Sequence, residues 1–184
     1  RLTDVTGVQT CALPIWEFGK PGRVLWENAN AIDRRAVEPY TEQKSMSKER
    51  TFAEDSLDLQ MIRRMLLHMV DELAFDLRES QKLTSVVTVK IRYADFNTYT
   101  KQKRIPYTAN NRVLVRYVPE LFDALYERRQ LIRLVGVKFG GLVHGNFQLN
   151  LFDDSIEEIH LLQQLDHIRR RWGKDSVMRA ACLT

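Results

Sequence analysis

The stretch LTSVVTVKIRY, residues 83–93, decides the fold, because its side chains alternate in character with a period of two. Large apolar residues such as Val87 and Ile91 fall on one face of an extended chain, and Lys90 and Arg92 fall on the other. A strand with this alternation buries one face and leaves the other in solvent. The stretch therefore predicts a half-buried β-strand with a basic outer face.

The segments on either side of this strand complete a domain of the α+β class. Runs of β-forming residues predict three further strands, and apolar residues at helical spacing predict two helices. In chain order, the expected elements are a strand at 44–52, a helix at 57–77, the strand at 83–93, a strand at 97–105, a helix at 111–126 and a strand at 131–139. Pro119 predicts a kink or a restart in the second helix, because proline removes a backbone donor. This order predicts a four-stranded sheet with both helices on one face.

Two segments precede the predicted domain. VTGVQTCALPI, residues 5–15, resembles the translation of a sequencing adapter, so residues 1–15 are expected to be non-native and are left out of the fold. FGKPGRVLWENANAID, residues 18–33, predicts a short helix that follows a turn rich in glycine and proline. Residues 34–43 are polar, contain Pro39 and show no apolar period, which predicts a linker.

A tail at residues 141–184 follows the predicted domain. An amphipathic helix is expected at residues 155–172, and Ser155 with Glu158 forms a capping box at its start. Its apolar positions at helical spacing are Ile159, Leu162, Leu165 and Ile168. The tail is therefore predicted to be helical, with a short helical terminus after residue 173.

The composition permits a polyanionic partner without requiring one. Lys and Arg total 28 against 24 Asp and Glu, which gives a net charge of +4 and an isoelectric point near 9.1. The only cysteines are Cys11 and Cys182, so neither a disulfide framework nor a paired-cysteine metal site is available. His160 and His167 lack a third ligand nearby. No apolar run approaches the roughly 20 residues of a membrane span, and the protein is expected to be cytoplasmic, without membrane contact.

The outer face of the predicted sheet is rich in cations and hydroxyl groups. Lys90, Arg92, Lys101 and Arg133 are expected to lie together on this face, with the helices behind the sheet. A surface that mixes Lys and Arg with Ser and Thr suits a phosphate backbone. Charge alone favours an ordinary solvated face, because exposed strands commonly carry Lys and Thr. Composition therefore leaves both interpretations open.

Five sequence blocks together carry a resemblance to a known family. They are FGKPGRVLWENANAID at 18–33, KSMSKERTF at 44–52, VVTVKIRYADFNTYTKQ at 86–102, LIRLVGV at 131–137 and QLNLFDD at 148–154. Over residues 16–152 their order and spacing resemble the C-terminal part of a bacterial Y-family translesion DNA polymerase of the DinB, or DNA polymerase IV, type. The resemblance implies the end of a thumb domain at 16–33, a tether at 34–43 and a little finger domain at 44–140.

By resemblance, the little finger lies along the major groove of primer–template DNA, holds its backbone and influences lesion choice and fidelity. The implied setting is translesion synthesis and DNA repair, as in the SOS response, by a monomeric protein. The candidate DNA-binding residues are Lys44, Ser45, Ser47, Arg50, Thr51, Lys90, Arg92, Thr98, Thr100, Lys101 and Arg133. The chain departs from the family at Ala31 and Ser47, where relatives often carry glycine.

The segment QLNLF, which follows the little finger, fits the QLxLF pattern by which many bacterial polymerases and repair proteins bind the sliding clamp. Gln148 is expected to dock on a polar rim, while Leu149, Leu151 and Phe152 fill an apolar groove of the clamp. The alternative is that these apolar side chains pack onto the domain's own core. In many relatives the motif lies at the extreme C-terminus, whereas here a further helix follows it.

No residues of the polymerase reaction are recognisable in the chain. That reaction needs clustered carboxylates holding two metal ions, Mg²⁺ in the parent enzyme, and the family carries them in its palm domain. The acidic pairs present, at 54–55, 153–154 and 157–158, are expected to lie at helix starts or in a linker. We therefore expect no catalytic residue, no metal site and no cofactor in this chain. A stand-alone nucleic-acid-binding module and a clamp-binding adaptor remain alternative interpretations.

Overall fold

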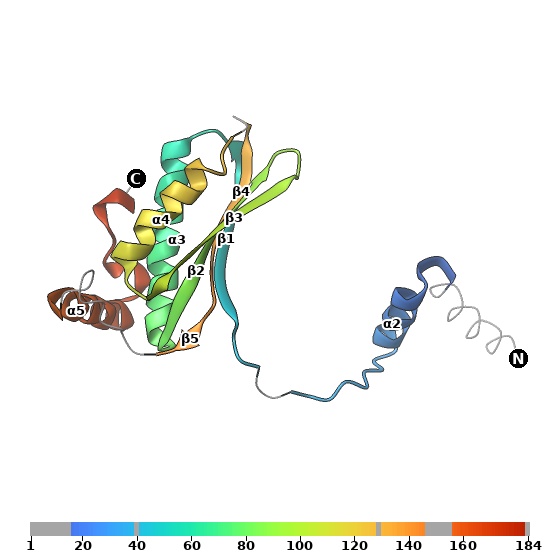
Figure 1. The fold of residues 1–184 in the computed structure, drawn as a ribbon. Coiled ribbons are helices and arrows are strands. Elements are labelled where there is room, and N and C mark those ends of the chain that lie inside the picture. Colours follow the sequence, from blue (N-terminus) through green and yellow to red (C-terminus); the bar gives the residue numbers. More distant parts are fainter. Residues whose placement is uncertain (1–15, 39–40, 128–129, 146–155, 183–184) are drawn as a thin grey trace, which may run out of the picture. The chain divides into compact units, whose positions relative to one another are not determined.

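The computed structural model describes residues 16–38, 41–127, 130–145 and 156–182. The chain divides into two units, Arg1–Glu42 and Gln43–Thr184. The second unit contains, in chain order, β1 (Ser45–Ser56), α3 (Leu59–Glu79), β2 (Lys82–Tyr93), β3 (Thr98–Thr108), α4 (Asn111–Asp123), β4 (Ile132–Gly140), β5 (Val143–His144), α5 (Ile156–Trp172), η1 (Lys174–Ser176) and η2 (Ala180–Cys182). The predicted order of strands and helices in the domain is confirmed (Figure 1).

The main sheet has the spatial order β1-β4-β2-β3, and every neighbouring pair is antiparallel. Its two central strands, β4 and β2, carry the most apolar sequences, and their inward side chains are fully buried. The short β5, which the sequence did not predict, pairs with the first residues of β2, Lys82 and Leu83. The α+β fold class is confirmed, with one two-residue strand added.

Helices α3 and α4 cover one face of this sheet (Figure 1). The side chain of Asp58 caps α3 by accepting hydrogen bonds from the backbone amides of Gln60 and Met61. The apolar stripe of α3, which includes Ile62 and Val70, packs with the inward residues of β2 and β4 in one core. Among the described residues of the second unit, no helix covers the opposite face of the sheet.

The structure corrects one of the two expectations for Pro119, a restart of the helix. Helix α4 runs through this proline without a break from Asn111 to Asp123. Leu121 and Phe122, which follow the proline, are buried in the core, and this burial offsets the lost backbone hydrogen bond. The side chain of Asn110 caps the helix by accepting from the amide of Arg112.

The tail helix α5 lies against α3 and α4 on the side away from the sheet (Figure 1). Its predicted apolar stripe is only partly correct. Leu162 is buried, but Ile168 is 38% exposed, and the residues that accompany Leu162 in the interface are Asp166 and Arg169. Ile159 and Leu165 are half-buried, so the helix docks through both apolar and charged side chains. Ser155 of the predicted capping box lies outside the described residues.

A buried ion pair joins α5 to α3. The guanidinium of Arg78 donates from Nε and Nη2 to the two carboxylate oxygens of Asp166, at 2.6 and 2.7 Å. Both side chains are 5% exposed. The same guanidinium donates to the carbonyl of Ala109 and to Asn111. A buried bidentate pair with further hydrogen bonds to Ala109 and Asn111 holds the tail in one position.

The first unit contains one described helix of full length, α2 (Lys20–Ala29), within the predicted span. It ends in a Schellman motif, in which the amides of Ala31 and Ile32 donate to the carbonyls of Asn28 and Glu27. Ala31 has a φ of 56°, in the left-handed region that glycine occupies most easily. This backbone conformation gives a physical reason for a glycine preference at that position. The adapter-like segment lies outside the described residues.

Candidate nucleic-acid interface

The register of the sheet fixes which side chains face away from α3 and α4. We call this side of the sheet the open face. It consists of four cross-strand rows, which are Ser45–Gly140–Val86–Arg104, Ser47–Lys138–Thr88–Gln102, Glu49–Gly136–Lys90–Thr100 and Thr51–Leu134–Arg92–Thr98. Directly paired residues of antiparallel strands point to the same side, so each row shares one face. Cations and hydroxyl groups predominate on this face.

Most of the predicted DNA-binding residues lie on the open face. Lys90 and Arg92 alternate with the fully buried Val89 and Ile91, as their strand pattern predicted. The further predicted residues in the four rows are Ser45, Ser47, Thr51, Thr98 and Thr100. Lys44 is exposed immediately before β1. The structure thus brings these side chains together on one surface.

Two predicted residues, Lys101 and Arg50, lie on the helix side of the sheet instead. Lys101 pairs with Val89, and its ammonium group donates to the carbonyl of Ala124 at the end of α4, at 3.0 Å. Arg50 pairs with Val135, in the row that contains Ile91. The expectation that Lys101 shares a face with Lys90 and Arg92 was therefore wrong. Strand β3 has no clear apolar alternation, so only its pairing with β2 decides which of its lysines face outward.

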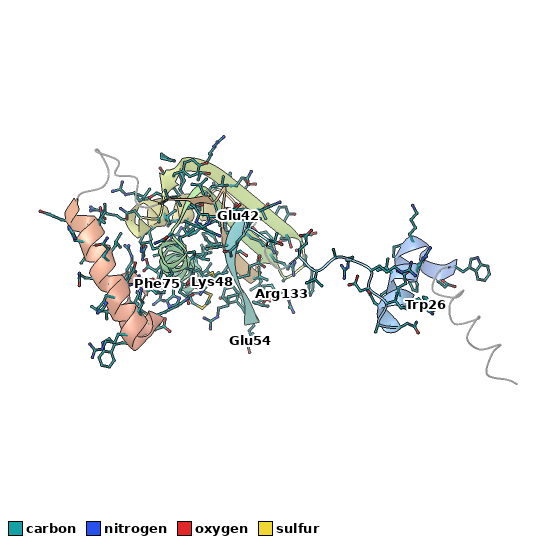
Figure 2. The ribbon with its side chains drawn as sticks, turned by 90° about the horizontal axis from the view of Figure 1, so that it is seen from below. Trp26, Glu42, Lys48, Glu54, Phe75 and Arg133 are labelled. Atoms are coloured by element: carbon teal, nitrogen blue, oxygen red, sulfur yellow. The ribbon has the colours of Figure 1, made fainter. Side chains whose placement is uncertain are left out.

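Arg133 stands at an irregularity of β4. The register shifts between Arg92 and Tyr93, whose partners are Leu134 and Ile132, so Arg133 is the additional residue of a β-bulge. Its guanidinium lies 4.7 Å from the ring centroid of Phe96 and 3.7 Å from a carboxylate oxygen of Asp55. Arg133, labelled in Figure 2, thus contacts residues at one end of the sheet.

The open face contains two cations that are not among the candidate DNA-binding residues. Lys138 is exposed in the row of Thr88, and Arg104 is exposed in the row of Val86. In the described part of the chain, no ion pair engages either side chain. The outward direction of Lys138 could be predicted from the sequence. It lies between the apolar residues Val137 and Phe139, which point to the opposite side of an extended strand. Arg104 could not be assigned to a face from the sequence alone, because β3 shows no apolar alternation and only its pairing with β2 decides.

The centre of the open face holds an ion pair that spans three strands. The ammonium of Lys90 on β2 lies 2.9 Å from both carboxylate oxygens of Glu49 on β1. Strand β4 runs between these strands, and its residue in this row is Gly136. In the next row Arg92 donates from Nε to the hydroxyl of Thr98, at 2.8 Å. On the open face, therefore, Glu49 neutralises Lys90, whereas Lys138 and Arg104 are exposed.

Lysines on the helix side, in contrast, bind groups of the protein's own helices. Lys48 pairs with Glu72 of α3 at 2.7 Å, and Figure 2 shows Lys48 beside that helix. Lys103 pairs with Glu120 of α4 at 2.8 Å. These pairs connect the sheet to its covering helices, so the lysines are not presented to an external partner.

The predicted clamp-binding residues Gln148, Leu149, Leu151 and Phe152 lie outside the described residues. The chain on both sides of them is attached to the same domain. Before them, the amide of Gly145 donates to the carbonyl of Gln81 at 3.1 Å. After them, α5 is bound through the Arg78–Asp166 pair.

The described residues contain no group of three His, Cys, Asp or Glu side chains that could hold a metal ion. Their helices also include none with the length and apolar character to cross a membrane.

Comparisons with known proteins decide the family. Residues 43–151 match the model of the impB/mucB/samB family C-terminal domain, which is more than half of the 184-residue chain. The chain belongs to the impB/mucB/samB family. In Y-family DNA polymerases this C-terminal domain is the little finger, so the recognition made from the five sequence blocks is confirmed.

The chain is similar to DNA polymerases IV that are longer than the chain itself. It is 32% identical over 173 residues to DNA polymerase IV of Clostridium acetobutylicum, covering 91% of this chain and 43% of the relative. It is 34% identical over 151 residues to DNA polymerase IV of Dehalococcoides mccartyi, covering 81% of this chain and 39% of the relative. The chain thus spans about two fifths of the length of these relatives.

Among solved structures, the chain is similar to one described as a complex of the beta-clamp processivity factor and the little finger domain of PolIV. The identity is 26%, the TM-score is 0.44, and the match covers 58% of this chain and 97% of that chain.

Proposed function

We propose that the open face holds the sugar–phosphate backbone of primer–template DNA for a Y-family polymerase. The observation that carries this proposal is the gathering of Lys90, Arg92, Arg104 and Lys138 on one helix-free face with serine and threonine hydroxyls between them. Cations supply affinity for phosphates without reading sequence, and hydroxyl groups fix position. Because contacts to phosphate groups carry no sequence information, the grip is expected to be independent of sequence.

A salt titration tests this proposal. Binding of the chain to a fluorescent primer–template duplex is measured by anisotropy at several salt concentrations. Four phosphate-facing cations, partly offset by Glu49, give an expected slope of log K against log salt of about −3. Affinity that does not change between low and physiological salt would contradict phosphate binding by this face.

We further propose that the chain serves translesion synthesis and repair of damaged DNA in the cytoplasm, as part of a longer polymerase. Its relatives are DNA polymerases IV more than twice its length, and the sequence carries no palm-like carboxylate strand. The palm of that polymerase would supply the Mg²⁺-dependent chemistry. In this arrangement residues 16–33 would be the end of the thumb and residues 34–43 the tether, and the little finger would hold the DNA.

We also propose that residues 148–152 bind the bacterial sliding clamp. The QLNLF sequence and its place directly after the little finger support this proposal, and the solved structure described above pairs a little finger with a clamp. Leu151 and Phe152 would be the apolar anchors of an extended peptide.

The clamp proposal is tested by titrating clamp with the chain and with its Leu151→Ala/Phe152→Ala variant. Each anchor is expected to contribute roughly 2 kcal/mol, so the double substitution weakens binding by over about a hundredfold. Asn150→Ala is the matched control and has little effect. Equal affinities would contradict the proposal. The stability of each variant is measured in parallel by urea unfolding. If the double variant loses stability as well as clamp binding, Leu151 and Phe152 instead pack on the domain.

A further inference from the structure

The side chains of Glu49 and Lys90 pair directly over Gly136, a residue that has no Cβ atom. The two side chains reach each other across β4, over Gly136. A Cβ atom at Gly136 would lie 2.7 Å from Cγ of Glu49 and 3.1 Å from the carbonyl oxygen of Lys48. Real Cβ atoms do not make a contact that short, so any other residue would push the Glu49 side chain away. Glycine at this position therefore leaves the Glu49 side chain room to lie across β4.

Glu49 is also the one carboxylate in the four rows of the open face. It lies in the same row as Lys90, near the middle of the surface, and its side chain is 40% exposed. A phosphate that approaches this row meets a cation already bound by a carboxylate. Since like charges repel, the phosphate must either displace Glu49 from Lys90 or bind beside a negative charge.

From these observations, and resting on the proposed DNA-binding function of the open face, we propose that Glu49 is an affinity-limiting residue of the DNA surface. It withholds Lys90 from the phosphate backbone and keeps the grip of the little finger weak. The role belongs to its charge and its position on the open face. An exposed ion pair contributes little to the stability of a domain, so stability alone does not account for the pair.

The test compares the full chain with its Glu49→Gln variant, which keeps the shape of the side chain and removes its charge. Binding to a primer–template duplex is measured by anisotropy over a range of salt concentrations. The variant is expected to bind about three- to tenfold more tightly at low salt, because Lys90 becomes available to a phosphate. The slope of log K against log salt is expected to become more negative by up to about one, because one further counterion is released on binding.

Two further proteins serve as controls. Glu72→Gln removes a carboxylate from the equivalent lysine pair on the helix side, where Lys48 lies, and changes the net charge by the same amount. Its DNA affinity is expected to stay within about twofold of the wild type, because that face is covered. The double variant Glu49→Gln/Lys90→Gln is expected to return to about wild-type affinity, because it removes both members of the pair together.

The outcomes separate this inference from the proposed function. If the wild-type chain binds DNA and Glu49→Gln leaves affinity and salt slope unchanged, or weakens binding, the affinity-limiting role is contradicted while the DNA-binding face stands. If Glu72→Gln tightens binding as much as Glu49→Gln, the effect is one of overall charge and the role is again contradicted. If neither the wild type nor Glu49→Gln binds DNA, the DNA-binding function fails and this inference fails with it.

Discussion

The two faces of one sheet carry the same kinds of charged residue and use them differently. On the helix side, Lys48 pairs with Glu72, and Lys101 donates to a backbone carbonyl at the end of α4. On the open face, Lys138 is exposed, and no ion pair engages it in the described part of the chain. The difference shows that backbone register, more than residue type, decides whether a lysine is available to an external partner.

The largest expected effect comes from placing a lysine on either face at adjacent positions of β2. Val89→Lys would put an ammonium group into a site that is fully buried, and burying an unpaired charge is expected to cost more than about 4 kcal/mol or to unfold the domain. Thr88→Lys, on the open face, is expected to change stability by less than about 1 kcal/mol. Urea unfolding followed by circular dichroism measures both. A Val89→Lys protein as stable as the wild type would reverse the assignment of the faces.

The second expected effect concerns the tail, which is joined to the helices through a buried pair. Asp166→Ala leaves Arg78 buried without its carboxylate partner and is expected to cost about 3 kcal/mol or to undock α5. Burial is the main cause that raises the pKa of the Cys182 thiol, so undocking is expected to lower that pKa and to speed alkylation at neutral pH. The measurement is the alkylation rate in a Cys11→Ser background.

The matched control for the tail is Asp175→Asn. Asp175 lies 3.2 Å from His68 and is largely exposed, so its substitution is expected to cost less than about 1 kcal/mol. If Asp166→Ala and Asp175→Asn have the same small effect on stability and on thiol reactivity, the buried pair does not hold the tail.

The sequence allowed the prediction of those features that depend on local alternation. The period of two in β2 placed Lys90 and Arg92 correctly on the open face, and the helical stripe of α3 was equally readable. Lys101 was misplaced, because the side that it faces depends on the register of two strands joined by a hairpin. The sequence of β3 has polar residues on both sides, so no local signal distinguishes its two faces.

The tail was predictable as a helix but not in its docking. Apolar spacing favoured Ile168 as a buried residue, whereas the structure buries Asp166. A buried carboxylate cannot be recognised without its partner, and Arg78 lies 88 residues earlier in the chain. The cross-strand pair of Glu49 and Lys90 was unpredictable for the same reason, since β1 and β2 are separated by a strand that comes later in the sequence.

A smaller effect is expected from Gly136→Ala, which tests the close packing between Gly136 and Glu49 in the row of Lys90. The added methyl group would contact Glu49 and the backbone of Lys48, at an expected cost of about 1 to 2 kcal/mol. Because Glu49 is then displaced from Lys90, DNA affinity is expected to rise about two- to threefold. Gly140→Ala is the control, since its Cβ would make only an ordinary contact with Val86, at 3.8 Å. Unchanged stability in Gly136→Ala would contradict the close packing in this row.

The most direct test of the central claim, that the open face binds DNA, compares two neutralised lysines of opposite faces, Lys138→Gln and Lys101→Gln. Each variant lowers the net charge equally, and salt-dependent anisotropy with primer–template DNA measures their affinities. We expect Lys138→Gln to weaken binding about three- to fivefold and to reduce the salt slope by about one, while Lys101→Gln stays within about twofold of the wild type. Equal losses in both variants, or a larger loss for Lys101→Gln, would contradict DNA binding by the open face.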